Sequence, residues 1–462
     1  MSRTLLCCAA LATLALPCRA EQTVTSTETV IHLTVQPMTA PKPALRYLLL
    51  PELKEMNLGN PIQNYLKCYM EQQQFFFDKE TFKRREEYQS MPLKELPAKD
   101  LLDYGRSALR QADWAARLDK PDWQILPKLK TDGIGLLLPD VQQMRALARA
   151  LQVRFRSEVA LGRFDDAIRT AQTMFAMSRH LGEHPTLIGD LVGIAIGAMA
   201  INPLEEMLGQ PGCPNLYWAL TNLPDPLVRL DKGAAGERVW TSWVFRDLDD
   251  RSPMSAEQIK KFIADKEPLL GLGTPIKEVQ GLRAWLDAQI KDDAVVRAAR
   301  RRVAEYGLPE ERLLRFPADQ VILLDEKRAF EVAFDDLIET LAFPAWQGEA
   351  IADEIPMDKE RGLFAAILIP AVSSVRQAQG RLTQRIALLR HVEALRLYAS
   401  GHKGALPASL SEIPVPLPED PFTGKPFRYE VIGNTAHLRG TPPRSSEKDP
   451  TFRVHYEVTL QK

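Results

Sequence analysis

The sequence carries almost no net charge. Lys and Arg together number 59 and Asp and Glu number 60, which leaves a formal charge of −1 at pH 7. Proteins that are drawn to nucleic acid or to anionic membranes by long-range electrostatics need a clear excess of basic residues. The arginines at 297 and 300–302 are followed by glutamates, a mixture typical of a solvated helix face. We therefore expect no nucleic-acid partner.

Cysteine is scarce, and three of the five cysteines fall within the first twenty residues. That stretch also has an early cation at Arg3, an apolar run from Leu5 to Leu16 and a small residue at Ala20, a pattern typical of a secretory signal peptide. We predict cleavage after Ala20 and export to the periplasm or the extracellular space.

Cleavage there leaves only Cys68 and Cys213 in the mature chain. A chain of this length can bury a large core without disulfides, so one bridge and two buried thiols are both open. Two cysteines cannot form a four-cysteine zinc site.

No uncharged hydrophobic run reaches the length of about 20 apolar residues that spans a membrane. The uncharged stretch from Leu191 to Asn202 is about half that length. Gly189, Gly193 and Gly197 recur at every fourth position and place small residues on one helix face. We expect this face to pack closely against another helix in a soluble domain, and we expect no transmembrane helix after signal cleavage.

The common catalytic motifs are missing as well. There is no GxSxG, no GxxxxGK[ST] and no GxGxxG after a convincing strand, which argues against serine hydrolases, nucleotide hydrolases and dinucleotide enzymes. One motif is present, because residues 180–184 (HLGEH) fit the HxxEH pattern of inverted zinc proteases. Gly182 and Pro185 disfavour the continuous helix that such a site needs. His180 and His184 are the candidate metal ligands, and no catalytic residue or cofactor is predicted.

Helical periodicity covers most of the chain. Asp140 is predicted to cap a helix whose apolar residues recur three or four apart as far as Val159. A turn at Gly162 and Arg163 leads into a second helix from Phe164. This hairpin resembles the second half of a tetratricopeptide repeat (TPR), in which a glycine, an aromatic residue and an alanine recur with this spacing. No second copy follows at a period of 34 residues.

Strand signals are confined to the two ends of the chain. Residues 24–35 are predicted as one strand, residues 427–438 as a hairpin around Gly433 and Asn434, and residues 451–460 as a further strand. Pairing of the first strand with the last would tie the termini together. The expected fold class is mainly α, a helical bundle or short helical-repeat array with a small C-terminal α+β domain.

Proline and glycine divide the chain into segments, and Pro370 is expected to kink or divide a long helix that starts near residue 362. The predicted organisation is a signal peptide at 1–20, an N-terminal strand and linker at 21–44, a helical domain with the TPR-like hairpin at 45–232, a second helical region at 237–360, and a long helix plus a small antiparallel sheet at 361–462.

Two resemblances extend this description. The helix ending at Tyr398, the turn at 404–407 (GALP) and residues 420–429 (DPFTGKPFRY) together resemble the C-terminal half of a major pseudopilin of type II secretion, which implies a similar shape for the end domain. The segments PALRYLLLPEL, GRFDDAIRTAQTMFAMSRH and PTLIGDLVGIAIGAM resemble an uncharacterised family of exported planctomycete proteins, which implies no particular activity.

The sequence leads to one expected function and two alternatives. The export signal, the repeat-like hairpin and the missing catalytic motifs favour a non-catalytic interaction or scaffold protein of the cell envelope with a protein partner. One alternative is an extracytoplasmic hydrolase on a helical scaffold, with or without zinc at His180 and His184. The other is a component of a secretion or pilus-like assembly.

Overall fold

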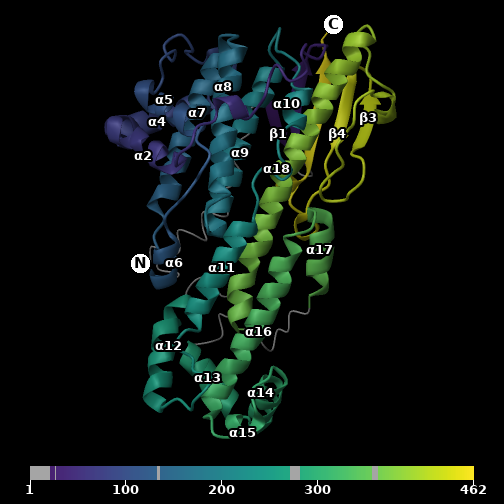
Figure 1. Ribbon diagram of the computed structural model, residues 1–462. Helices are drawn as coiled ribbons and strands as arrows, with labels where there is room; N and C mark the ends of the chain where they lie inside the picture. Colours follow the sequence, from purple (N-terminus) through teal and green to yellow (C-terminus); the bar gives the residue numbers. More distant parts are fainter. Residues whose placement is uncertain (1–20, 26–27, 133–135, 271–280, 356–362, 462) are drawn as a thin grey trace. The chain divides into compact units, whose positions relative to one another are not determined.

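A computed structural model describes residues 21–25, 28–132, 136–270, 281–355 and 363–461 (Figure 1). The fold is mainly α with one small C-terminal sheet, as expected. The described chain divides into two compact units. We call residues 21–124, 137–233 and 377–461 the sheet unit, and the described residues of 125–136 and 234–376 the helical unit. The predicted segments 45–232 and 361–462 thus both contribute to the sheet unit.

The helical unit has an aromatic core. The Phe245 ring lies 5.1 Å from that of Phe364 and 5.8 Å from that of Phe330. The sequence predicts one helical segment over residues 287–306, but two helices share that range. The first ends at Ile290, and Asp292 caps the second by accepting a hydrogen bond from the Ala294 amide. The helices are α6 (Leu126–Asp132), α11 (Asp231–Val244), α12 (Ala256–Leu270), α13 (Leu282–Ile290), α14 (Asp293–Glu305), α15 (Glu310–Leu313), α16 (Ala318–Thr340), α17 (Ala345–Glu354) and the first part of α18 (Leu363–Gly401).

The sheet unit contains the helix hairpin that the sequence predicts. Gly162 makes the turn with a φ of +68°, and the second helix begins at Phe164 as expected. The first helix begins at Pro139, so Asp140 lies in its first turn and is not the cap. The helices are α2 (Pro61–Glu71), α3 (Gln73–Phe77), α4 (Lys79–Ser90), α5 (Arg106–Ala115), α7 (Pro139–Ala160), α8 (Phe164–Leu181), α9 (Leu187–Leu208), α10 (Tyr217–Thr221) and the remainder of α18.

The glycine stripe lies on α9 and packs against α8. A Cβ at Gly193 would stand 2.8 Å from the Ser178 carbonyl oxygen, and one at Gly189 would stand 2.4 Å from His184 Cβ. By length and composition α9 is apolar enough to cross a membrane, but 83% of its most apolar window is buried inside the protein. The glycines therefore let helices approach closely within the unit, as the sequence predicts.

This close approach gives a stability prediction. Replacing Gly193 with Ala is expected to destabilise the protein by about 1–3 kcal/mol, because the new methyl group meets backbone that cannot rotate away. Gly401→Ala is the matched control, since nothing lies within 4 Å of a Cβ at that position and the expected change is within about 1 kcal/mol. Urea unfolding followed by circular dichroism measures both. Equal midpoints for the two variants would contradict the packing role of the stripe.

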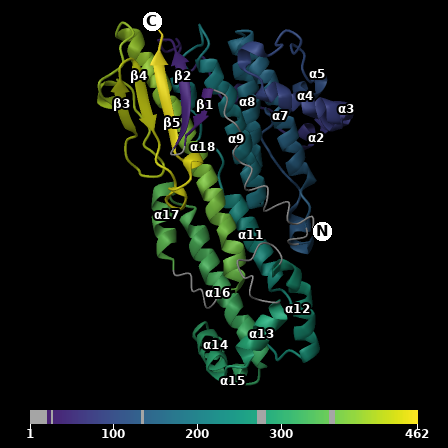
Figure 2. The same cartoon turned by 180° about the vertical axis from the view of Figure 1, so that it is seen from behind.

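One mixed five-stranded sheet joins the two ends of the chain (Figure 2). Its order is β1-β2-β5-β4-β3, and β2 pairs in parallel with β5 over their whole lengths, so the pairing of the first and last strands that the sequence left open is present. Two details of the prediction are wrong. The N-terminal strand is a pair of antiparallel strands, and the sheet is mixed rather than antiparallel. The strands are β1 (Glu21–Val24), β2 (Thr29–Val35), β3 (Arg428–Ile432), β4 (Thr435–Arg439) and β5 (Val454–Leu460).

The two faces of this sheet differ in polarity. The C-terminal part of α18 lies against one face (Figures 1 and 2), where Leu438, Tyr456 and Val458 are fully buried. Because side chains alternate along a strand, the residues between them point to the opposite face. We call that side the polar face, and its members include His32, Thr34, Glu430, His437, Arg439, His455 and Glu457.

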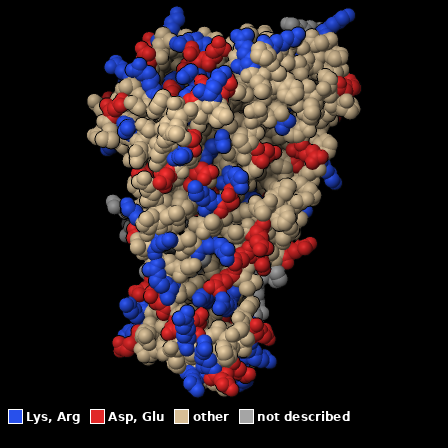
Figure 3. All heavy atoms as spheres, in the orientation of Figure 1, with Lys and Arg blue, Asp and Glu red and all other residues tan. Residues whose placement is uncertain are grey.

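Other sequence-based expectations are settled by the described residues. Cys68 and Cys213 are both buried free thiols, which decides between the two possibilities left open above. The helix α18 continues through Pro370, so Pro370 does not divide it, and the alternative of a kink there stays a prediction. Acidic and basic residues are interspersed on the face drawn in Figure 3, in keeping with the balanced composition.

Candidate metal centre on the polar face of the sheet

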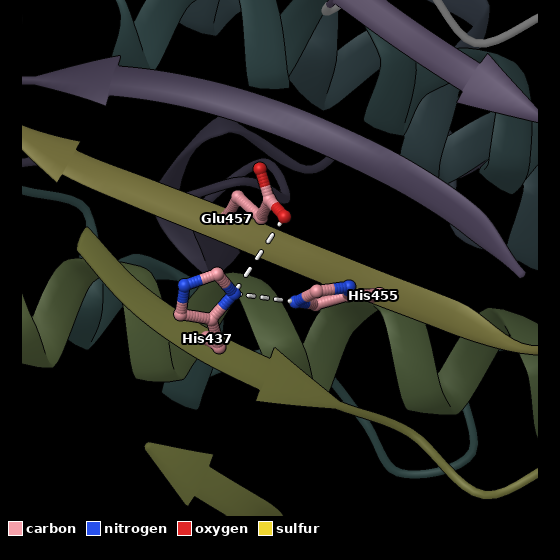
Figure 4. Close-up of side chains that lie close together, drawn as sticks. All are labelled: His437, His455 and Glu457. Carbon is pink, nitrogen blue, oxygen red and sulfur yellow. Dashed lines mark hydrogen bonds and ion pairs between the residues drawn. The ribbon is translucent and has the colours of Figure 1, made fainter. Parts of the chain in front are cut away.

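Three potential metal ligands meet on the polar face. His437 lies on β4 directly opposite Glu457 of β5 in the antiparallel register, and His455 lies two residues before Glu457 on the same strand. Since positions i and i+2 of a strand share a face, His455 and Glu457 both stand beside His437. Figure 4 shows the three side chains turned toward one another.

The ligand atoms of these residues converge. His437 Nδ1 lies 3.0 Å from His455 Nε2 and 3.6 Å from Glu457 Oε1 (Figure 4). All three ligand atoms lie within 4.8 Å of one another. Among the described residues, this is the group of His, Cys, Asp or Glu side chains that brings three such atoms together.

The spacing suits a small transition-metal ion. In a tetrahedral zinc site with ligand distances of about 2.0–2.1 Å, neighbouring ligand atoms stand about 3.3 Å apart. The separations of 3.0 and 3.6 Å lie on either side of that value, and the shorter one is a hydrogen bond between the two rings, whose proton a bound ion would displace. Two imidazoles and one carboxylate are also a donor set that zinc and its neighbours in the first transition row accept.

Two further side chains hold these ligands in place. Glu28 Oε1 lies 2.9 Å from His455 Nδ1, and His32 Nδ1 lies 2.9 Å from the second oxygen of Glu457. A carboxylate on the far nitrogen of a histidine keeps the proton there, so His455 Nε2 presents its lone pair toward His437. Metal-binding histidines commonly have this outer partner.

The electrostatics of the cluster favour a neutral imidazole at its centre. His455 is only 2% exposed, and burial lowers its pKa, although the hydrogen bond that it donates to Glu28 opposes the shift. Arg439 stands 3.9 Å from Glu28 and offsets the charge of that carboxylate. A neutral ring is the form that binds a metal ion, so His455 does not have to lose a proton at neutral pH.

The histidines predicted from the HxxEH motif lie elsewhere in the sheet unit. His180 is in the last turn of α8, where its Nδ1 lies 3.0 Å from the Tyr65 hydroxyl. His184 follows the helix, and its Nδ1 lies 2.8 Å from the Thr186 hydroxyl. Burial lowers the pKa of His180 to about 3 and that of His184 to about 4. Both rings are held in hydrogen bonds to hydroxyl groups, and metal binding there stays a prediction.

Sequence reasoning missed the cluster on the sheet because its three ligands lie on two strands whose pairing the sequence did not predict. Its outer partner Glu28 is 427 positions from His455 in the chain. A local signal was available, since His455 and Glu457 sit at i and i+2 of a predicted strand and therefore share a face. The pairing of that strand with the one carrying His437 could not be deduced from either segment alone.

A second cluster of titratable groups joins three helices of the same unit. Arg154 on α7 donates two hydrogen bonds to Asp113 of α5, at 3.0 and 2.7 Å. Glu158, one turn further along α7, accepts a hydrogen bond of 2.6 Å from the Thr170 hydroxyl of α8. Burial raises the pKa of Glu158 to about 7, against the attraction of Arg154. Between about pH 4.5 and 7, the folded protein therefore holds a proton on Glu158 that the unfolded chain would release.

This shift predicts a pH dependence of stability. Because the folded pKa of Glu158 is about 7 and its ordinary value is 4.5, its contribution is fully present below pH 4.5 and is lost as the pH rises through 7. The loss amounts to about 3 kcal/mol at 1.36 kcal/mol per pKa unit. Glu158→Gln is expected to remove that decline, so its stability relative to the native chain should increase between pH 5 and 8. A constant difference across this range, measured by urea unfolding, would contradict the prediction.

The chain was compared with known protein families, curated proteins and solved structures. No protein-family model matches the chain, and no curated protein or solved structure matches it.

Proposed function

We propose that this protein is an exported, non-catalytic interaction or scaffold protein that binds one divalent transition-metal ion of the zinc class on the polar face of its sheet. The observation that carries the proposal is the convergence of His437, His455 and Glu457, whose ligand atoms lie within 4.8 Å of one another. Export is supported by the signal-like first twenty residues.

The surroundings of the site support a binding role. Glu28 and His32 each contact a ligand residue on the side away from the converging atoms, which orients the ligands before a metal arrives. Such orientation raises affinity because less side-chain freedom is lost on binding.

Metal titration of the purified chain from residue 21 to 462 tests the proposal. After dialysis against a chelator, the protein is expected to take up one equivalent of Zn²⁺ in isothermal calorimetry and to retain it through gel filtration. Mg²⁺ and Ca²⁺ are expected to produce no binding signal, because these ions prefer oxygen ligands. Failure to bind Zn²⁺, or equal binding of Mg²⁺, would overturn the proposal.

A hydrolase is the second candidate, and one observation favours it. Catalytic zinc sites use three protein ligands and leave the fourth position for water, and the cluster offers three. The zinc-loaded protein would then hydrolyse ester or peptide substrates at a rate that disappears with chelator. Zinc binding without any such activity favours the non-catalytic role.

A further inference from the structure

The metal ligands and the residues that orient them come from opposite ends of the chain. His437, His455 and Glu457 belong to the last two strands in the sequence, β4 and β5. Glu28 stands immediately before β2, and His32 lies within it. The N-terminal strand pair is therefore joined to the C-terminal strands in two ways, by the backbone ladder between β2 and β5 and by side-chain contacts on the polar face.

The N-terminal strand pair forms one side of the sheet. β1 is the edge strand and pairs with β2, and β2 pairs with β5. Side chains add two contacts on the polar face, from Glu28 to His455 and from His32 to Glu457, both at 2.9 Å. β1 pairs with β2 and not with β5, so the strand pair is held through β2: by its ladder with β5, by its packing on α9, by the hydrogen bond from Arg396 to the Gln36 carbonyl, and by these two side-chain contacts.

These two contacts act on the atoms that would bind the metal. Glu28 keeps the His455 proton on Nδ1, so Nε2 accepts the hydrogen bond from His437 Nδ1 and can offer its lone pair to a metal ion that displaces that proton. His32 occupies the second oxygen of Glu457 and turns the first toward His437. Loss of such outer partners lowers metal affinity about 10–100-fold in known sites. By reciprocity, a bound ion must strengthen the docking of the N-terminal strand pair by the same factor.

We propose that a zinc-class ion held by His437, His455 and Glu457 stabilises the pairing of the N-terminal strands β1 and β2 with the C-terminal strands. We call this role of the ion the clasp. This inference rests on the proposed function. It adds that metal availability outside the cytoplasm controls how firmly the N-terminal segment is held.

Hydrogen exchange followed by mass spectrometry tests the clasp with Zn²⁺ as the probe. In the native chain, saturating Zn²⁺ is expected to slow exchange of peptides covering residues 29–35 by about tenfold or more. Peptides from β3, the other edge of the same sheet, provide the internal reference and are expected to change less.

Two variants separate the clasp from metal binding itself. Glu28→Gln is expected to bind Zn²⁺ about 10–100-fold more weakly and to show a correspondingly smaller slowing of exchange in β2. Glu447→Gln is the matched control, because this exposed carboxylate lies in the same C-terminal segment and outside the cluster. It is expected to behave like the native chain.

The outcomes are distinguishable. If the native chain binds no Zn²⁺, the proposed function fails. If it binds Zn²⁺ but exchange in residues 29–35 is unchanged, and Glu28→Gln binds as tightly as the native chain, metal binding stands and the clasp is wrong.

Discussion

His437→Gln is expected to lower the Zn²⁺ affinity of the mature chain by two orders of magnitude or more, since loss of an outer partner alone costs about 10–100-fold. The reason is geometric. His437 Nδ1 stands between His455 Nε2 at 3.0 Å and Glu457 Oε1 at 3.6 Å, so its removal leaves two ligands that no longer surround an ion. Glutamine keeps similar polarity and fits the partly exposed position on β4. Calorimetric titration measures the loss.

Two other histidines provide the controls for this experiment. His402→Gln changes an exposed histidine on the turn after α18 and is expected to leave zinc affinity unchanged. His184→Gln tests the motif that the sequence alone singled out, with circular dichroism to check folding because His184 is 1% exposed. If zinc binding is lost in His184→Gln and kept in His437→Gln, the metal centre lies at the HxxEH motif and the polar face of the sheet has another role.

Much of the fold could be predicted because its signals are local. The turn at Gly162, the close-packed glycines of α9 and the hairpin around Gly433 depend on the conformation or size of single residues. The break between α13 and α14 was missed, although Asp292 is a strong helix cap, because apolar periodicity continues on both sides of it. Local patterns therefore located elements better than they located boundaries.

The site could not be predicted because it depends on strand order. The parallel pairing of β2 with β5 brings His32 beside Glu457, and the antiparallel pairing of β4 with β5 brings His437 to the other side. Neither register can be read from a segment by itself, since the order of the strands is a property of the whole sheet. The HxxEH motif was conspicuous because its residues are adjacent in sequence, but adjacency says little about which atoms converge.

Arg396→Met is expected to destabilise the sheet unit by about 3–5 kcal/mol, because it leaves a buried carboxylate without its partner. Arg396 and Glu393 on α18 are both fully buried and form an ion pair at 2.9 Å. The same guanidinium donates hydrogen bonds to the carbonyl oxygens of Gln36, Cys213 and Pro214. Because Gln36 directly follows β2, this arginine also anchors the chain that leads out of the N-terminal strand pair. Urea unfolding at pH 7 measures the effect.

Two comparisons show whether Arg396→Met destabilises the protein through the unpaired charge of Glu393 or through lost packing. One is the pH dependence of the destabilisation, and the other is a variant of an exposed ion pair. Burial already raises the pKa of Glu393 and Arg396 opposes that shift, so Glu393 in the variant becomes protonated more readily and the destabilisation should shrink as the pH falls. Arg163→Met is the control, because its pair with Asp166 is about half exposed and is expected to contribute no more than about 1 kcal/mol. A destabilisation by Arg396→Met that is independent of pH would show that lost packing, rather than the unpaired Glu393, dominates. An effect no larger than that of Arg163→Met would remove Arg396 as the anchor between α18 and the end of β2.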